Sequence, residues 1–200
     1  MFLYLKQRDI YFLKQKNRRI KKWNQICTFA FMSKGNKNLS MMEINQAAPK
    51  FQDVSIAPMH TAEHILNQTM VRLFHCGRAV GAHIERKKSK CDYLLKKEPT
   101  PEQMQEIENK VNDIISKNLP VSVEYLTRKE AEKMFDLSRL PKDASQILRI
   151  VKIGDYDACP CIGIHVNNTS EIGKFNIVSS DFHGKILRIR FHLSKKDGRV

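Results

Sequence analysis

Two pairs of metal-ligating side chains stand out in the sequence, and the members of each pair are four positions apart. His60 and His64 form one pair, and Cys161 and His165 form the other. On a helix, side chains at this spacing lie on one face about one turn apart, so the two histidines can share a metal ion. A mixture of thiolate and imidazole ligands suits Zn²⁺, whose protein sites are usually tetrahedral. Together the two pairs predict one four-ligand zinc site.

Two better-known zinc motifs do not fit these residues. The metalloprotease helix requires Glu directly after its first His, where this sequence has Thr61. The deaminase signature requires His-x-Glu and Pro-Cys-x-x-Cys, whereas this sequence has Ala62 in the first motif and Pro160-Cys161-Ile162-Gly163 in the second. Taken singly, Cys161 is also explained as a small buried side chain and His165 as a hydrogen-bonded loop residue. The joint spacing favours the metal site.

The histidine pair is predicted to lie on a helix over residues 58–74. Ala62, Leu66, Met70 and Leu73 recur there at helical spacing and form an apolar stripe. At roughly 100° per residue, the histidine face points about 140° away from the centre of this stripe. The histidines are therefore expected to face a separate space, as residues that line a site would.

The remaining pattern predicts the elements that must position the two pairs. Cys161 and His165 follow a strand expected over 148–153 and the turn Gly154-Asp155. Thr100-Pro101-Glu102-Gln103 predicts the capped start of a second helix that ends near Lys117. A short helix is expected over 129–135, and further strands over 82–85, 91–95, 121–127, 174–179 and 185–193. Strands outnumber helices without regular alternation, which predicts an α+β fold with a largely antiparallel sheet packed with helices.

These motifs resemble the editing domain that is shared by alanyl- and threonyl-tRNA synthetases and by free-standing alanyl-tRNA editing proteins. The resemblance spans roughly residues 58–193 and follows the family's order. It rests on His60-Thr61-Ala62-Glu63-His64, Ile153-Gly154-Asp155-Tyr156, Cys161-Ile162-Gly163-Ile164-His165-Val166 and Thr169-Ser170-Glu171-Ile172-Gly173. The resemblance implies an α+β fold, a mischarged tRNA as substrate, and a zinc ion held by the four residues His60, His64, Cys161 and His165.

The same resemblance implies substrate-binding residues and raises a question of specificity. It places Asp92, Gly163 and Thr169 at the substrate, Asp92 as part of an Asp-aromatic pair on a strand that faces the pocket. The alanyl branch reads Cys-Gly-Gly-Thr-His at the second motif, where this chain has Ile162 and Ile164 in place of the first Gly and the Thr. Two β-branched apolar groups and the loss of a hydroxyl would alter the pocket that inspects the amino acid. Which amino acid and which tRNA are edited therefore stays open.

The charge of the chain predicts a polyanionic partner and separates an N-terminal segment from the rest. The formal net charge is +14 and the isoelectric point is near 9.7. Residues 1–40 contribute +9 of this charge. We expect residues 1–41 to be a basic, poorly ordered extension and residues 42–200 to form the editing domain. The first segment has three alternative interpretations: an RNA-binding arm, an organelle-targeting segment, or an extension upstream of a natural start at Met32, Met41 or Met42.

The expected compartment and partners follow from the same composition. Five cysteines at irregular spacing, without a secretory signal, favour a reducing compartment, so we expect a cytoplasmic protein. No apolar run approaches the ~20 residues that span a bilayer, so no membrane partner is expected. The basic cluster Arg86, Lys87, Lys88 and Lys90 is expected to contact tRNA phosphates. Weaker candidates for the same role are Arg78, Arg188 and Arg190.

The function expected from these features is ATP-independent hydrolysis of the ester between a wrong amino acid and the tRNA 3′ ribose. The enzyme would act in trans, with Ser or Gly attached to the tRNA for alanine as the expected substrates. Zn²⁺ could polarise the carbonyl, lower the pKa of a water, or hold the amino group, and His60 or His64 is expected also to orient the attacking water. The alternatives are a non-catalytic zinc-containing RNA-binding module and an editor of mischarged threonine tRNA. The oligomeric state is not indicated.

Overall fold

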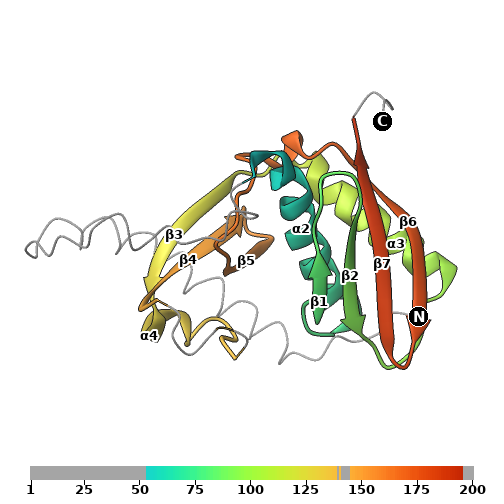
Figure 1. The fold of residues 1–200 in the computed structure, drawn as a ribbon, viewed down its shortest axis with the longest axis horizontal. Coiled ribbons are helices and arrows are strands. Elements are labelled where there is room, and N and C mark those ends of the chain that lie inside the picture. Colours follow the sequence, from blue (N-terminus) through green and yellow to red (C-terminus); the bar gives the residue numbers. More distant parts are fainter. Residues whose placement is uncertain (1–52, 139, 141–144, 196–200) are drawn as a thin grey trace, which may run out of the picture. The chain divides into compact units, whose positions relative to one another are not determined.

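The computed structural model describes residues 53–138, 140 and 145–195, and in this part of the chain helix α2 lies between two antiparallel sheets (Figure 1). The first sheet has the order β1 (Gly81–His83), β2 (Ser89–Leu94), β7 (Ile186–Ser194) and β6 (Lys174–His183). The second has the order β3 (Val121–Thr127), β4 (Ile147–Ile153) and β5 (Asp157–Pro160). The predicted α+β fold with antiparallel strands is confirmed. The predicted basic extension over 1–41 lies outside the described residues.

The helices are α2 (Ala57–Phe74), α3 (Pro101–Ser116) and the short α4 (Arg128–Ala131). Two 3₁₀ turns, η2 (Val54–Ile56) and η3 (Thr169–Glu171), complete the described elements. In the ranges that the structure describes, none of these helices combines the length and the apolar character that crossing a bilayer requires.

Helix α3 forms where its local signals predict it. The hydroxyl of Thr100 accepts a hydrogen bond from the Gln103 amide, and the Gln103 side chain accepts one from the Thr100 amide, which completes the capping box. Its buried residues fall on one stripe, and they are Ile107, Val111, Ile114 and Ile115. The helix ends before Asn118, whose φ of 52° is left-handed. The buried stripe anchors α3 in the same core as α2.

Helix α2 buries two faces, and this arrangement positions the histidine pair. Ala62, Leu66 and Met70 are fully buried in the core that the helix shares with the four-stranded sheet. His60 and His64 are also buried, at 6% and 3% exposure, but they contact residues at β5 and in the loop that follows it. The angular separation between the histidines and the apolar stripe therefore reflects two different packing partners.

The largest differences between the expected and the observed strands are at two places. Strand β6 continues to His183 instead of ending at 179, because the chain turns at Gly184-Lys185, where both φ angles are positive (53° and 71°), as a two-residue hairpin turn of type I′ requires. Strand β5 was not expected, and it forms by pairing with β4 in the register Ile153↔Asp157. The helix expected over 129–135 is confined to Arg128–Ala131.

Strand β6 is an edge strand of its sheet, and two side chains of α3 bind its backbone. The side-chain amide of Asn112 donates to the Phe175 carbonyl and accepts from the Phe175 amide. The carboxylate of Glu108 accepts from the Ile177 amide. In the described sheet no further strand pairs with this side of β6, and these bonds give its backbone groups partners.

Candidate metal centre

The four residues predicted as metal ligands converge in the structure. The Sγ atom of Cys161 lies 3.4 Å from Nε2 of His60 and 3.4 Å from Nε2 of His165. With His64, these residues offer four ligand atoms that all lie within 4.8 Å of one another. His60 and His64 come from α2, while Cys161 and His165 come from the loop after β5. Residues about a hundred positions apart thus form one cluster that could hold a metal ion.

The spacing within the cluster fits a tetrahedral ion. With Zn–S near 2.3 Å and Zn–N near 2.1 Å, the sulfur-to-nitrogen edge of a tetrahedron is about 3.6 Å. The two measured edges from Cys161 are 3.4 Å, close to this value. The ring centroid of His165 lies 4.2 Å from that of His60 and 4.5 Å from that of His64, so the three rings crowd around one point. The donor set and its geometry therefore fit Zn²⁺.

Hydrogen bonds fix which nitrogen of His60 and His64 faces the cluster. Nδ1 of His60 lies 3.3 Å from the Ile164 carbonyl, which can only accept a hydrogen bond. Nδ1 of His64 lies 3.2 Å from the carboxylate of Asp157, which as an anion also only accepts. In the neutral imidazole the proton therefore sits on Nδ1, and Nε2 keeps its lone pair. This is the tautomer that a metal ligand at Nε2 needs.

Thr61 fixes the tautomer of His165 in the same way. The Thr61 hydroxyl donates its proton to the Ala57 carbonyl at 2.8 Å. Nδ1 of His165, at 3.3 Å, must then donate to the Thr61 oxygen, which also accepts from the Val166 amide. Thr61, which occupies the position where the metalloprotease motif has Glu, thus orients the ligand His165.

A buried carboxylate supports the histidine pair from β5. The side chain of Asp157 is 1% exposed, binds His64, and receives both arms of the Arg78 guanidinium at 2.8 and 3.1 Å. Burial alone would raise the pKa of Asp157, but the hydrogen bonds from His64 and Arg78 outweigh burial and lower that pKa to about 2. A carboxylate on the outer nitrogen of a ligand histidine orients the ring and raises its basicity. Arg78, a weaker candidate for phosphate contact, holds Asp157 in the structure.

The electrostatics of the cluster favour a bound cation. Burial would raise the pKa of Cys161, but hydrogen bonding with His165, His60 and His64 lowers it to about 2, so the sulfur is a thiolate. Burial would lower the pKa of His64, but the electrostatic interaction with Cys159 and the hydrogen bond with Asp157 raise it well above the ordinary value. The site thus favours positive charge beside the Cys161 sulfur, and a bound metal ion would take the place of a second proton on His64.

Two further residues position the loop that carries Cys161 and His165. One guanidinium nitrogen of Arg149 donates to the Cys161 carbonyl at 2.7 Å and to the Gly163 carbonyl at 2.8 Å. A Cβ atom on Gly163 would lie 2.1 Å from Cε1 of His60, so only glycine allows the loop to approach this ring. Gly163 was expected at the substrate, and in the structure it lies against a ligand.

Two predicted substrate residues are not brought to the cluster. Cys91 and Tyr93 of β2 are buried in the core, so Asp92 between them points to the opposite face of the sheet, where both of its oxygens bind Arg188 at 2.7 Å. This corrects the expectation that Asp92 faces the pocket. Thr169 is fully buried, and its hydroxyl accepts from the Leu119 amide and donates to the Ile115 carbonyl, so it stabilises the end of α3.

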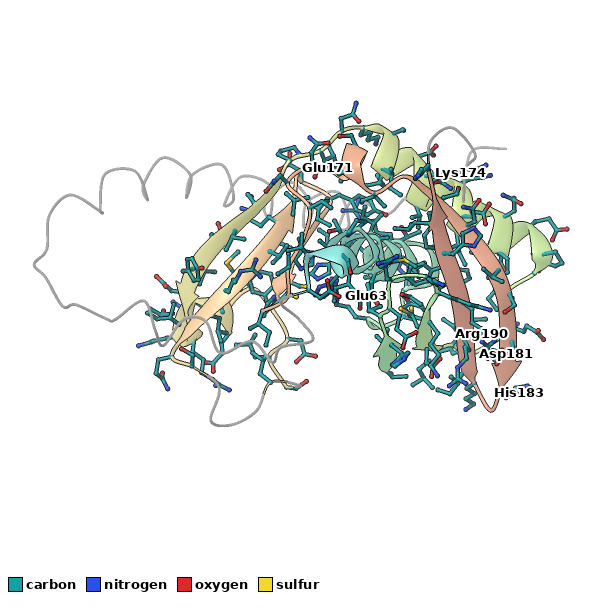
Figure 2. All side chains as sticks on the ribbon, turned by 45° about the horizontal axis from the view of Figure 1, so that its top comes forward. Glu63, Glu171, Lys174, Asp181, His183 and Arg190 are labelled. Carbon is teal, nitrogen blue, oxygen red and sulfur yellow. The ribbon has the colours of Figure 1, made fainter. Side chains whose placement is uncertain are left out.

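The residues predicted to contact tRNA lie in and beside the β1–β2 turn. Arg86, Lys87 and Lys88 are exposed in this turn, and Lys90 is half-buried on β2. Arg190, labelled on β7 in Figure 2, pairs with Lys90 in register and forms an ion pair with Asp181 of β6. Phosphate contact by this cluster stays a prediction.

Sequence reasoning missed three side chains that organise the centre, namely Asp157, Arg149 and Asn67. Asp157 lies on β5 and Arg149 lies on β4. Their role becomes visible only once β5 pairs with β4 and contacts α2. Asn67 lies one turn beyond Glu63 on the histidine helix, at the spacing of a side-chain pair, and its amide donates to Glu63 at 2.8 Å. That spacing was the one available signal.

Comparisons with known proteins relate the chain to tRNA synthetases. Residues 148–190 match the family described as the threonyl and alanyl tRNA synthetase second additional domain, a range that includes Cys161 and His165. The chain is 36% identical over 126 residues to the alanine-tRNA ligase of Geobacillus kaustophilus. The aligned region covers 62% of this chain and 14% of the ligase. It is 35% identical over 141 residues to that of Methanocella arvoryzae, which covers 68% of this chain and 16% of the ligase.

A third relative, the alanine-tRNA ligase of Bacillus subtilis, is 34% identical over 122 residues, which covers 60% of this chain and 14% of the ligase. The chain thus spans about one seventh of the ligases that it matches. Its antiparallel α+β fold is consistent with the matched family. By sequence, this chain is related to the second additional domain of threonyl- and alanyl-tRNA synthetases.

Proposed function

We propose that this protein is a zinc-dependent aminoacyl-tRNA hydrolase that acts in trans on the tRNA for alanine when Ser or Gly is wrongly attached. The observation that carries the proposal is the convergence of His60, His64, Cys161 and His165 on one point, in a chain related to alanine-tRNA ligases. In the reaction, water adds to the ester carbonyl and the bond to the ribose oxygen breaks. The amino acid leaves as a carboxylate, and the tRNA regains its hydroxyl group.

The four ligand residues would hold the ion, and the surrounding residues would keep them in place. Zn²⁺ bound there would supply a Lewis acid for the ester carbonyl. Both nitrogens of His60 are engaged in the structure, Nδ1 with the Ile164 carbonyl and Nε2 with Cys161. This supports a ligand role for His60, while an added role in orienting water stays part of the proposal.

Of the two isoleucines that depart from the alanyl pattern, one is placed to meet a substrate. Ile162, next to Cys161, is 58% exposed, whereas Ile164 is partly buried and packs against the core. We propose that Ile162 contacts the amino-acid side chain, where an apolar group of this size limits the room available. Small residues such as Ser and Gly fit this restriction. The exposed turn with Arg86, Lys87 and Lys88 would contact the tRNA backbone.

The test is a deacylation panel with zinc-loaded protein. The substrates are the tRNA for alanine charged with Ser, Gly or Ala and the tRNA for threonine charged with Ser, and the readout is release of labelled amino acid. We expect turnover of the mischarged alanine tRNA and not of the correctly charged one. Serine release from the threonine tRNA alone would assign the protein to threonine editing instead.

A matched pair of cysteine variants controls the panel. Cys161→Ser should reduce turnover by about 100-fold or more, because losing even an outer partner of a metal ligand commonly costs about 10–100-fold. Cys76→Ser, at a half-buried cysteine outside the cluster, should leave turnover unchanged. Tight tRNA binding without turnover of any mischarged tRNA, with zinc bound, would favour a non-catalytic RNA-binding module.

A further inference from the structure

Glu63 places a carboxylate beside the metal centre without belonging to the ligand set. It lies on α2, and in the sequence it stands between the two ligand histidines (Figure 2). Its Oε2 atom lies 3.7 Å from Nε2 of His60, which is the nitrogen that faces Cys161, and its side chain is 14% exposed. The group of ligand atoms that lie within 4.8 Å of one another does not include Glu63. The carboxylate therefore lies next to a ligand nitrogen and stays partly exposed.

A chain of hydrogen bonds holds Glu63 in this position. Asn67, at 3% exposure, accepts a hydrogen bond from the Ala79 amide at its side-chain oxygen. Its side-chain nitrogen must then face Glu63, to which it donates at 2.8 Å. Because the backbone amide of Ala79 fixes the Asn67 amide, the carboxylate of Glu63 is oriented before any ligand arrives.

Among the described residues, the carboxylate of Glu63 has no lysine or arginine in an ion pair with it. In the described part of the chain, His60 is the one basic side chain within ion-pair distance of Glu63. Arg78 interacts electrostatically with Glu63, but both arms of its guanidinium group donate hydrogen bonds to Asp157. An ionised carboxylate can accept about four hydrogen bonds, and Asn67 supplies one. A largely buried carboxylate of this kind is costly unless a cationic donor joins it.

We propose that Glu63 binds the α-ammonium group of the aminoacyl ester. This inference rests on the proposed function and names the group by which the site would recognise its substrate. Covalent geometry places the α-nitrogen only about 2.5 Å from the ester carbonyl carbon. An ammonium group anchored on Glu63 therefore places that carbonyl beside the cluster. Peptidyl-tRNA, whose nitrogen is an uncharged amide, lacks the group that Glu63 binds and is rejected.

The experiment compares substrates with free and blocked amines. Wild-type protein should hydrolyse Ser-tRNA for alanine about 10–100-fold faster than the N-acetyl-Ser form, the difference that one hydrogen bond to a charged group commonly makes. Glu63→Gln keeps the size of the side chain and its bond to Asn67 but removes the charge, so it should lose most of this preference. Glu106→Gln, at an exposed position of α3, should keep it. Zinc content and thermal unfolding are measured for each protein.

A binding arm separates this inference from the proposed function. The probe is 3′-seryl-amido-adenosine, a non-hydrolysable amide, with a free or acetylated amine, measured by calorimetry. If wild-type protein prefers the free amine and Glu63→Gln does not, Glu63 binds the ammonium group even if no ester is hydrolysed. Equal rates and equal binding for free and acetylated amines in the wild type, or an undiminished preference in Glu63→Gln, would overturn the inference. A parallel loss of zinc in Glu63→Gln would also overturn it, because Glu63 would then be a ligand.

Discussion

Replacing Gly163 with Ala tests whether the ligand loop must touch His60. The added Cβ would lie 2.1 Å from Cε1 and 2.5 Å from Nδ1 of His60, whereas carbon atoms in contact are usually about 3.5–4.0 Å apart. The ring or the loop must therefore move by more than about 1 Å, which far exceeds the ~0.2 Å tolerance of metal–ligand distances. We expect zinc affinity to fall by at least about 100-fold, and overpacking to lower the free energy of unfolding by about 1–3 kcal/mol.

The assay is competition for zinc with a chromophoric chelator, together with urea unfolding of the metal-free protein. Gly77→Ala is the matched control, because nothing lies within 4 Å of a Cβ at that position and its φ is outside the left-handed region, as for Gly163. This control should bind zinc as the wild type does. Wild-type zinc affinity in Gly163→Ala would refute the geometry on which the metal centre is built.

Other predictions address the residues around the ligands. Arg149→Met removes two hydrogen bonds to loop carbonyls and should weaken zinc binding by about 10-fold in the same chelator assay, with unchanged affinity as the contrary result. Asp157 has a pKa of about 2 against an ordinary 3.8, so its stabilisation is complete above about pH 4 and is lost as the pH falls toward 2. Between those pH values, metal-free wild type should lose about 2 kcal/mol more unfolding free energy than Asp157→Asn does, and parallel acid-unfolding curves would contradict this. Thr169→Val should cost about 1–3 kcal/mol in urea unfolding and leave zinc affinity intact, whereas a selective loss of substrate binding would restore the substrate role.

Local signals were sufficient for the parts of the fold that depend on neighbours in sequence. The start of α3 is set by Thr100 and Gln103, which bond each other within one turn, and its stripe repeats at helical spacing. The four ligands were found in the same way, because each pair lies within five consecutive residues. The convergence of the two pairs was an inference from ligand chemistry and from the family resemblance, and the structure brings them together.

The remainder depended on contacts between distant segments. Strand β5 is four residues long and contains Asp157 and Pro160, so no alternating apolar pattern marks it, and its pairing with β4 decides its conformation. The misplacement of Asp92 was avoidable, because the apolar Cys91 and Tyr93 flank it and strand alternation already assigns it to the polar face. The outer partner of His64 could not be inferred, since that carboxylate comes from a strand 93 residues away.

The bonds from Asn112 and Glu108 to strand β6 bear on how the protein behaves at high concentration. A free strand edge offers a row of amides and carbonyls to any other extended chain, and edge-to-edge pairing of this kind leads to aggregation. The Asn112 side chain fills the positions that an incoming strand would use at Phe175, and Glu108 adds a negative charge at Ile177. Helix α3 therefore covers this stretch of the β6 edge. A substitution at Asn112 would leave the Phe175 backbone groups open to pairing with another chain, without changing the metal centre.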